Sequence, residues 1–465
     1  MSHPRPGRRL WRLMRSSLWP IPLLGVTVAV ALGVLMPLVD ALLGTAGPAS
    51  PIAILFGGGP AATRGLLGAI AGSLISVTGV TFSLTVVALQ LGSSQYSPRL
   101  LQTFVTDPVV QTSLAQLVGT FVYALTVLRT VRTADEAGGG GSFVPRLSIT
   151  LAFLFALGSV AALVFFLGHL ARSLRVETML RNVHDEAALA IRQIDDDGPE
   201  HTGRLPAEPG VPVESIGSGF VVEIDVDHLL RAARDADVLI ALSPRMGDAV
   251  VVGTPLTEIW PAGGAPLGDV QSLHHAVNRG VRLSYERTPE GDAPYSLRKI
   301  VDIAGRALSP GINDPTTAVH ALSHVSALLG DLLPGRTAVR AWRDEDGTVR
   351  LLLPRYTAEE LITVGLEEPL QYASGQPAVL RRIAGLLQEV AWRVRGQGLD
   401  AVLRRLLDTT VEQARETTSI ATHETDAWRA AVGDALAGRW SPARRLGPER
   451  ERQGTGGPEA AEDVS

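Results

Sequence analysis

Cysteine is absent from this chain of 465 residues, and lysine is nearly absent. Without cysteine the chain cannot form disulfides, use a thiol nucleophile or build a cysteine-based zinc site. Lys299 is the only lysine among 42 basic residues, a bias that we interpret as the codon usage of a GC-rich bacterium. The formal net charge of −5 is small for this length, so the composition gives no reason to expect a nucleic-acid partner.

Motifs that carry enzyme chemistry are also missing. The sequence has no phosphate-cradling glycine loop with a lysine and no nucleophile elbow. His320 and His324 are one helical turn apart and could share a metal, but no glutamate completes a metalloprotease pattern. The acidic turn Asp344–Gly347 lacks the ligand spacing of a calcium-binding loop. We expect no catalytic residue, no metal and no cofactor, although a cryptic enzyme in the second half of the chain stays open as a hypothesis.

Four long apolar stretches dominate the first 172 residues. Each has roughly 20 residues or more, enough for a helix to cross a hydrocarbon core of about 30 Å. Backbone groups in lipid must be satisfied internally, which favours helices. The sequence therefore predicts an α-helical membrane domain with four transmembrane helices, at Pro20–Leu43, Leu66–Leu91, Val109–Leu128 and Leu147–Leu170.

The distribution of arginine predicts the orientation of these spans. Five arginines precede the first span, Arg99 lies in the loop after the second, and three follow the fourth. The opposite side would hold four: Arg64, Arg129, Arg132 and Arg146. Nine against four favours cytoplasmic N- and C-termini in a multi-pass protein of the bacterial inner membrane. A cleaved signal peptide and a twin-arginine signal are the alternatives for the first span, whose apolar core is longer than the usual signal sequence.

The second span is the most polar of the four. Its polar residues form two stripes, Ser76, Ser83 and Gln90 at seven-residue spacing and Thr78, Thr81 and Thr85 at i, i+3 and i+7. One interpretation is that these groups bond to neighbouring helices or to their own carbonyls. The other is that one stripe lines a hydrated path around an oligomer axis. No charged residue lies within the span, which argues against a proton relay or a charge-selective filter there.

Further features of the second and third spans lead to additional predictions. Gly68-x-x-x-Gly72 in the second span matches the small-residue pattern of close helix packing. The third span offers Gln111, Gln116 and Thr120 as polar partners for the second. Before it, a short interfacial helix is predicted from Ser97, and Asp107-Pro108 is typical of a helix N-cap followed by proline at the first position.

The rest of the chain has the composition of a soluble α+β protein. We expect a basic cytoplasmic N-terminus (1–17), the membrane domain (18–175), a helix and linker (176–212), a small β-rich module (213–262), a mainly helical α+β domain (263–436) that includes a helical bundle portion, and a disordered tail (437–465). Within this half the pattern predicts a strand at 219–224, a hairpin around the acidic turn and a helix at Ala358–Tyr372.

The β-rich module carries turn signals that resemble a known small fold. Gly247-Asp248 and Gly253 supply tight turns in a rhythm similar to the hairpins of biotinyl and lipoyl carrier domains. The carrier lysine of those domains has no counterpart, since Lys299 lies well downstream. We expect a β-barrel-like structural module without a covalently held cofactor.

The densest local signature is Arg306–Ala318. Pro310-Gly311 ends one helix, and Asp314-Pro315 starts the next with a cap and a first-position proline. A structural turn explains most of this pattern. The alternative is that Arg306, Asn313 and Asp314 bind a ligand or a neighbouring subunit.

With these features in view, the chain resembles a bacterial family of predicted membrane proteins catalogued as domain of unknown function 2254. The matching segments follow in order: Leu18–Pro22, Gly68–Arg99, Thr120–Tyr123, Leu128–Val131 and Arg306–Thr317. Pro289–Asp292 departs from the expected pattern, which has glutamine before the aspartate, and this puts any binding role of that position in doubt. The resemblance implies the architecture and names no activity.

Two classes of function fit these observations. The first is a homo-oligomeric channel or transport-related protein with a cytoplasmic regulatory domain. The alternative is a membrane-anchored sensor or scaffold whose cytoplasmic domain binds an unknown ligand or protein partner. Both imply contact with the lipid bilayer, and the first also implies self-association.

Overall fold

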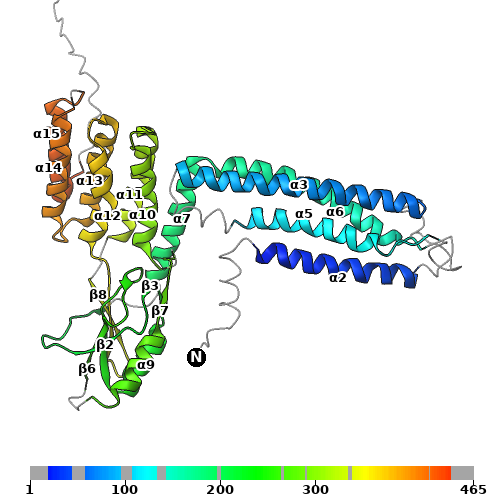
Figure 1. The fold of residues 1–465 in the computed structure, drawn as a ribbon. Coiled ribbons are helices and arrows are strands. Elements are labelled where there is room, and N and C mark those ends of the chain that lie inside the picture. Colours follow the sequence, from blue (N-terminus) through cyan, green and yellow to red (C-terminus); the bar gives the residue numbers. More distant parts are fainter. Residues whose placement is uncertain are drawn as a thin grey trace, which may run out of the picture. The chain divides into compact units, whose positions relative to one another are not determined.

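The computed structural model describes residues 19–43, 58–95, 107–133, 143–195, 201–262, 267–288, 291–333, 338–417 and 419–440. The short helix predicted from Ser97 and most of the predicted tail lie outside these residues. The chain divides into two compact units (Figure 1). The first unit comprises Met1–Asp196 and Thr288–Thr317, and the second comprises Asp197–Arg287 and Ala318–Ser465.

Four helices of the first unit are long and apolar enough to cross a membrane, as predicted. They are α2 (Pro20–Leu43), α3 (Pro60–Gln95), α5 (Pro108–Leu128) and α6 (Arg146–Ser173). The 21 residues of α5 make a helix of about 31 Å. This length matches the thickness of a hydrocarbon core, about 30 Å.

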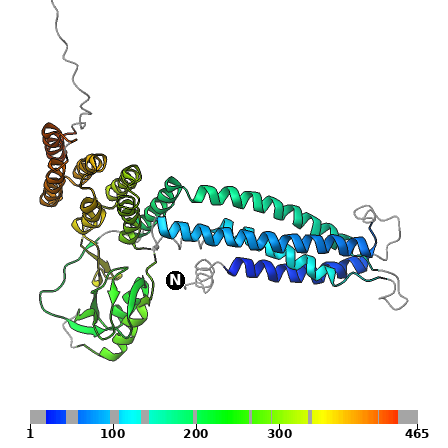
Figure 2. The same cartoon turned by 45° about the horizontal axis from the view of Figure 1, so that its top comes forward.

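Helix α5 is the centre of this bundle and packs against α2, α3 and α6 (Figures 1 and 2). Its contact with α2 depends on glycine. A Cβ atom added at Gly33 would lie 2.7 Å from the Cβ of Thr126, and one at Gly25 would lie 3.1 Å from that of Ala115. The two helices therefore approach more closely at these positions than larger side chains permit.

Charged side chains from neighbouring helices satisfy the helix ends of the bundle. Pro145 at the N-cap of α6 makes no side-chain cap. Instead the Asp40 carboxylate of α2 accepts hydrogen bonds from the backbone N–H groups of Leu147 and Ser148, at 2.8 and 2.9 Å. Beyond the C-terminal end of α5, the Arg64 guanidinium donates to the Val131 carbonyl at 3.0 Å. These contacts replace the water that would otherwise bond the free backbone groups.

The opposite end of the bundle carries the predicted cap at Asp107. Its Oδ1 accepts a hydrogen bond from the N–H of Val109, and Pro108 occupies the first helical position. Its Oδ2 lies 2.6 Å from Nε2 of His169, near the end of α6. One carboxylate thus caps α5 and ties it to α6.

A polar cluster joins α5 to α6 within the bundle. The Gln116 amide donates to the Phe155 carbonyl at 3.2 Å, and the Ser159 hydroxyl donates to Oγ1 of Thr120 at 2.9 Å. Gly158 leaves the space for the Gln116 side chain, since a Cβ there would lie 3.3 Å from its Nε2. We had expected these α5 side chains to serve the second span, but the structure pairs Gln116 and Thr120 with the fourth.

The first unit also contains α7 (Val176–Asp195), which follows the last span, and α10 (Ala293–Ala307). These two helices pack against each other although about 100 residues separate them in sequence. Most of α10 is buried, including Lys299.

The second unit is an α+β structure with two sheets. The first has six strands in the order β1-β8-β9-β4-β6-β2, and the second has three in the order β5-β3-β7. The strands are β1 (His201–Thr202), β2 (Val211–Glu214), β3 (Gly219–Ile224), β4 (Val238–Leu242), β5 (Ala249–Val250), β6 (Pro255–Pro261), β7 (Val281–Ser284), β8 (Val339–Arg343) and β9 (Val349–Pro354). Only the β4–β9 pair is parallel among the pairs described.

The prediction of a β-barrel-like module was wrong, because no closed barrel forms. Successive strands of 213–262 alternate between the two sheets: β2, β4 and β6 join the larger sheet, and β3 and β5 join the smaller one. Gly247 and Gly253 do form turns with positive φ, at 85° and 80°. The turn at Gly253 follows a strand of two residues and leads into the other sheet, so it does not close a hairpin.

Helices complete the second unit, and the first two of them pack on its sheets. They are α8 (Val226–Asp235), α9 (Val270–Gly280), α11 (Pro315–Leu332), α12 (Ala358–Tyr372), α13 (Pro377–Val394), α14 (Asp400–Arg415) and α15 (Thr422–Leu436). Leu229 of α8 and Leu273 of α9 pack with Ile240 and Leu351 of the larger sheet in one core. Thr357 and Glu360 form a capping box at the start of α12, which explains why that helix has its predicted bounds.

The packing of glycine in the bundle yields a stability prediction. We expect Gly33→Ala to lower the stability of the bundle by about 1–3 kcal/mol, because the new methyl group overlaps Thr126. Gly168→Ala in α6 is the control, since a Cβ there meets no atom within 4 Å. This control should be neutral or stabilising by up to about 1 kcal/mol. Thermal unfolding in detergent measures both, and equal effects of the two changes would contradict the model of close packing.

Candidate functional site

The most distinctive surface of the first unit lies on α3. The side of α3 that is turned away from the bundle is rich in exposed small or polar residues, and it also exposes Val80, Val86 and Val87. We call this surface the small-residue face of α3; it comprises Gly65, Gly68, Ala69, Gly72, Ser76, Gly79, Ser83 and Gln90. It therefore contains the whole first stripe predicted from the sequence.

The second predicted stripe of α3 lies elsewhere. Thr81 and Thr85 are buried within the bundle, and Thr78 is half-buried. Each threonine hydroxyl donates to the carbonyl one turn earlier in the same helix, at 2.7–2.9 Å. This stripe therefore uses its polar groups inside α3, and only the stripe of Ser76, Ser83 and Gln90 faces outward.

The exposed faces of the neighbouring spans have a different character. Helix α2 exposes large aliphatic side chains such as Val34 and Leu38, and α6 exposes Leu157, Val164 and Phe165. Such side chains suit contact with lipid. On α3, by contrast, a Cβ added at Gly65, Gly68, Gly72 or Gly79 would meet no atom within 4 Å. These four glycines are not required by the packing of the bundle that contains them.

The contact between Arg64 and Val131 shows at which level along the bundle the residues of the small-residue face lie. Helices α3 and α5 run in opposite directions, and Arg64 touches Val131. Counting 23 residues back from Val131 reaches Pro108, and 23 forward from Arg64 reaches residue 87. Gln90 therefore lies near the level where α5 begins, whereas Ser76 lies near the middle of the bundle.

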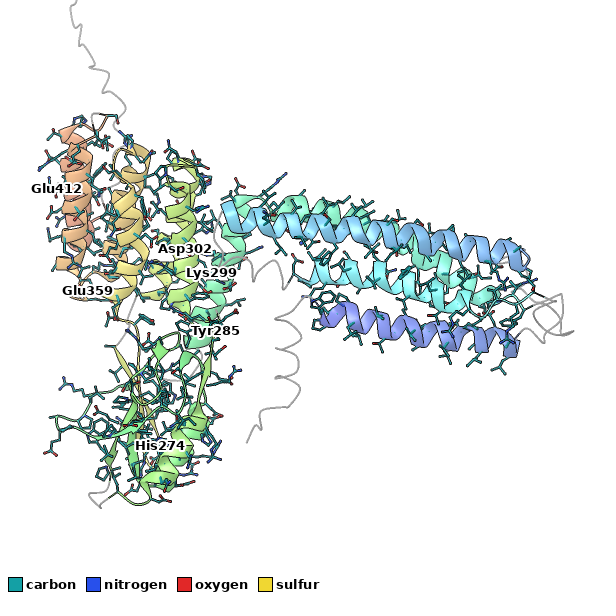
Figure 3. All side chains as sticks on the ribbon, viewed as in Figure 1. His274, Tyr285, Lys299, Asp302, Glu359 and Glu412 are labelled. Atoms are coloured by element: carbon teal, nitrogen blue, oxygen red, sulfur yellow. The ribbon has the colours of Figure 1, made fainter. Side chains whose placement is uncertain are left out.

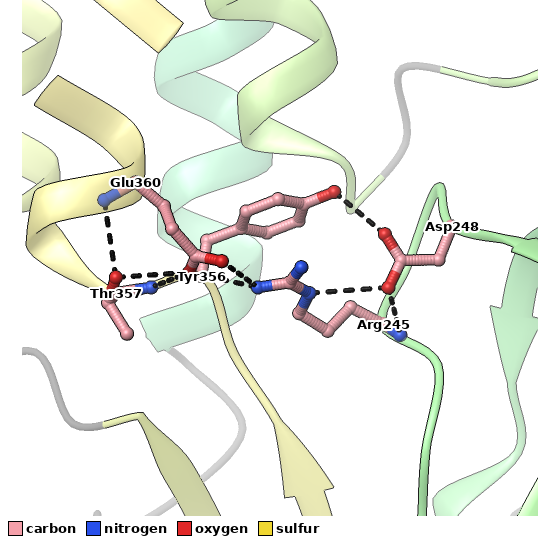
Figure 4. Close-up of polar contacts among 5 residues, drawn as sticks. All are labelled: Arg245, Asp248, Tyr356, Thr357 and Glu360. Atoms are coloured by element: carbon pink, nitrogen blue, oxygen red, sulfur yellow. Dashed lines mark hydrogen bonds and ion pairs between the residues drawn. The ribbon is translucent and has the colours of Figure 1, made fainter. Parts of the chain in front are cut away.

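A charged network in the second unit ties the turn after β4 to α12 (Figure 4). Arg245 donates to both Glu360 oxygens at 2.9 Å and to Asp248 Oδ2 at 3.2 Å. Tyr356 lies under the Arg245 guanidinium, 3.9 Å from ring centroid to Cζ, and its hydroxyl donates to Asp248 at 3.0 Å. One guanidinium pairs with two carboxylates, and Tyr356 adds a hydrogen bond to one of them, so the chemistry of the network is that of a structural tie.

The same network controls the ionisation of Glu360. Burial alone would raise the pKa of this carboxyl, but hydrogen bonds from Arg245 and Thr357 outweigh it and hold the pKa below its ordinary value. Asp248 was expected only as a turn residue, and its role in this tie followed from no sequence signal, because Arg245 and Glu360 are 115 residues apart.

The residues predicted from Arg306–Ala318 lie in the turn between α10 and α11. Asn313 adopts a left-handed conformation with φ of 49°. The Asp314 carboxylate accepts hydrogen bonds from the N–H groups of Thr316 and Thr317, which caps α11. Arg306 is exposed in the last turn of α10. A role of these residues in binding stays a prediction.

Side chains that could hold a metal do not converge in the part of the chain that the structure describes. No group of three or more His, Asp or Glu residues forms a metal-binding set among those residues. Asp344 of the acidic turn instead accepts hydrogen bonds from Arg350 and from the backbone N–H groups of Asp346 and Thr348. The Arg350 hydrogen bond is the main reason that the pKa of Asp344 is lowered.

Lys299 is a residue whose importance is indicated by its rarity in the sequence. It lies on α10 with 1% of its side chain exposed, and its Nζ is 2.6 Å from Oε1 of Glu186 on α7 (Figure 3). We had interpreted its rarity only as codon usage. An ammonium and a guanidinium differ in shape and in number of donors, so this buried pair is not equivalent to an arginine pair.

Comparison with known proteins identifies a protein family and relatives that match most of the chain. A family model described as "Predicted membrane protein (DUF2254)" matches residues 15–389. Uncharacterized proteins of Mycobacterium bovis and Mycobacterium tuberculosis are each 32% identical over 383 residues, which cover 81% of this chain and 72% of the relative. No solved structure matches the chain.

The Arg245 network yields a prediction about pH. We expect Glu360→Gln to destabilise the second unit by roughly 1–2 kcal/mol at pH 7, a modest value because the pair is partly exposed. The lowered pKa of Glu360 gives the sign: its contribution is complete above the ordinary carboxyl pKa of about 4.3 and disappears as the pH falls through the folded value. The difference between variant and wild type should therefore shrink below about pH 4.3.

Tryptophan fluorescence during unfolding measures this difference, since five of the seven tryptophans lie in the second unit. Glu359→Gln is the matched control, because this neighbouring carboxylate is exposed and lies 3.7 Å from Arg405. A difference for Glu360→Gln that stays constant down to pH 3 would contradict the assignment.

Proposed function

The chain belongs to the DUF2254 family of predicted membrane proteins, and on this premise we propose that it works as a homo-oligomer with a channel or transport-related role. Its copies would meet through the small-residue face of α3. The path would run between copies, along the stripe of Ser76, Ser83 and Gln90.

The observation that carries this proposal is the contrast between the exposed faces of the bundle. Leu38 and Val164 project large apolar side chains from α2 and α6. The part of the α3 face from Gly65 to Gly79 instead presents glycine, alanine and serine, whereas Val86 and Val87 are exposed further along it. Each glycine in a helix costs up to about 1 kcal/mol relative to alanine. Since nothing within one bundle fills the space beside Gly72 and Gly79, a second copy of α3 is the occupant that explains them.

The interior of a single bundle supports a path between copies rather than through one copy. Helix α5 occupies the centre, with Leu117, Tyr123 and Val127 fully buried. Its polar side chains Gln116 and Thr120 are engaged with α6. The proposed path is neutral, because hydroxyl, amide and backbone groups line it, and selection by charge would then have to occur at its ends.

The proposed orientation places both termini and the second unit in the cytoplasm. The arginine count supports it, and Arg64, one of the four arginines on the opposite side, has a structural role. The Arg64 guanidinium donates to the Val131 carbonyl, three residues beyond the end of α5, and so joins α3 to the segment after α5. The second unit would then regulate the path from the cytoplasmic side.

A sensor or scaffold role is the second candidate, and one surface of the second unit favours it. Ile216, Val251 and Val252 are exposed by 65, 58 and 57%. Hydrogen bonds between Ser215 and Thr254 and between Gly253 and Ser215 hold the two turns together. Rigid, exposed aliphatic side chains of this kind are typical of a binding surface.

Self-association is tested by adding bulk to the small-residue face. We expect Gly72→Leu to shift the detergent-solubilised protein from oligomer to monomer, because the side chain separates the paired α3 helices. Gly168→Leu on α6 is the matched control, since this glycine is also exposed and open but lies on a lipid-type face. Light scattering or native mass spectrometry gives the mass. A wild-type monomer, or two variants of equal mass, would refute assembly through α3.

The path is tested by cysteine accessibility, which is clean because the chain contains no cysteine. We expect a membrane-impermeant, water-soluble thiol reagent to label Ser76→Cys and Ser83→Cys in vesicles, since both positions would face water. Val80→Cys, at the margin of the face, and buried Thr81→Cys should stay unlabelled. Protection of all four positions in a protein that still oligomerises would leave the face as a packing surface and favour the sensor or scaffold role.

A further inference from the structure

The only lysine of the chain lies in one of its most buried helices. Lys299 is 1% exposed on α10, and its Nζ lies 2.6 Å from Glu186 Oε1 on α7. The hydroxyl of Ser296, one turn earlier on α10 and fully buried, donates to the same carboxylate oxygen at 3.4 Å. The Tyr295 ring centroid is 5.2 Å from Nζ. A single carboxylate therefore receives two buried donors from α10.

These surroundings explain why an ammonium is needed here. A guanidinium carries five N–H donors in a rigid fork, whereas an ammonium is a compact charge with three. The contacts described around Nζ offer one carboxylate oxygen and the face of one aromatic ring. An arginine would bring buried donors that these groups cannot accept, which is costly.

The position of α10 along the chain gives this ion pair a consequence. The chain leaves the second unit after Arg287 and returns to it at Ala318, and the segment between them belongs to the first unit. Helix α10 makes up half of that segment and packs on α7, the helix that follows the last span directly. The contact between Glu186 and Lys299 thus joins residues 113 apart in sequence.

We propose that Glu186, Ser296 and Lys299 form a latch that holds α10 on α7, and that opening of this latch is a separate conformational step of the folded protein. Two apolar side chains of similar size could hold the helices with no buried charge to desolvate, whereas an ion pair holds them in one register and leaves a buried charge unmatched when it breaks. This makes the contact two-state, either closed and matched or open and hydrated. The proposal does not depend on self-association through α3.

The wild-type chain supplies its own probe, because Lys299 is its only side-chain amine. An amine-acylating reagent followed by peptide mass spectrometry reports how often Nζ becomes accessible, with the terminal amine as an internal reference. We expect Lys299 to be acylated slowly but measurably at denaturant concentrations where tryptophan fluorescence still reports the folded second unit. Acylation that begins only with global unfolding would show that no separate opening step exists, and would overturn the proposal.

The residues of the latch are tested in an Ala304→Cys background, because Ala304 is fully buried on α10 outside the latch. Thiol labelling of this position reports opening without depending on the reactivity of the lysine. We expect Glu186→Gln to accelerate labelling by about tenfold to 100-fold. Lys299→Arg should accelerate it similarly despite keeping the charge. Glu177→Gln, an exposed carboxylate on the same helix, is the matched control and should change nothing.

Two outcomes of the variant experiment would contradict the latch. Equal labelling of Glu186→Gln and its parent would show that the carboxylate does not hold α10. Wild-type labelling in Lys299→Arg would show that the site has no preference for an ammonium. If a variant fails to fold, acylation of wild-type Lys299 still decides whether the opening step exists.

Discussion

Backbone polar groups in a hydrocarbon environment must find partners inside the protein, and the bundle of α2, α3, α5 and α6 is organised by this constraint. Within a helix the backbone N–H and C=O groups bond to each other, so only the groups at the helix ends need other partners. Asp40 meets it for α6 and Asp107 for α5. The side chain and the helix it serves come from different elements at Asp40 and at Arg64, so each cap also fixes the position of one helix against another. The charged side chains of the membrane segments therefore serve mainly to hold helices against one another.

The same constraint separates two kinds of polar residue within the bundle. Thr81, Thr85 and Thr120 are buried and Gln116 is half-buried, and all four have hydrogen-bond partners in α3, α5 or α6. Ser76 donates to its own helix, to the Gly72 carbonyl at 3.2 Å, yet its side chain stays exposed beside open glycines. Close helix approach is already achieved at Gly33, where Thr126 fills the space of a side chain. Among the described residues, Gly65, Gly68, Gly72 and Gly79 of α3 have no such neighbour, and this difference is the basis of the proposed assembly surface.

The sequence was sufficient for features that depend on local physics. Apolar length located the four spans, and Asp107-Pro108 located the start of α5, because a cap needs only residues adjacent in sequence. Prediction failed for features that depend on residues far apart in the sequence. The turns at Gly247 and Gly253 are real, but strand pairing places the flanking strands in different sheets, and turn chemistry carries no information on which strand a neighbour joins. The Arg245 tie and the Lys299 pair likewise join residues more than 100 positions apart.

The rarity of lysine is a property of the whole sequence, but it also carries information about one position, Lys299. A mutational bias toward arginine acts on every lysine position alike, so it cannot by itself explain which lysine remains. The surroundings of Lys299 suggest a physical reason why this lysine remains. A guanidinium in its place would bury N–H donors that Glu186 alone cannot accept. At exposed ion pairs such as Arg282 with Glu223, either cation satisfies the partner because water accepts the remaining donors. At an exposed pair the two cations are therefore close to equivalent, whereas at a buried pair such as that of Lys299 their donor number and geometry differ.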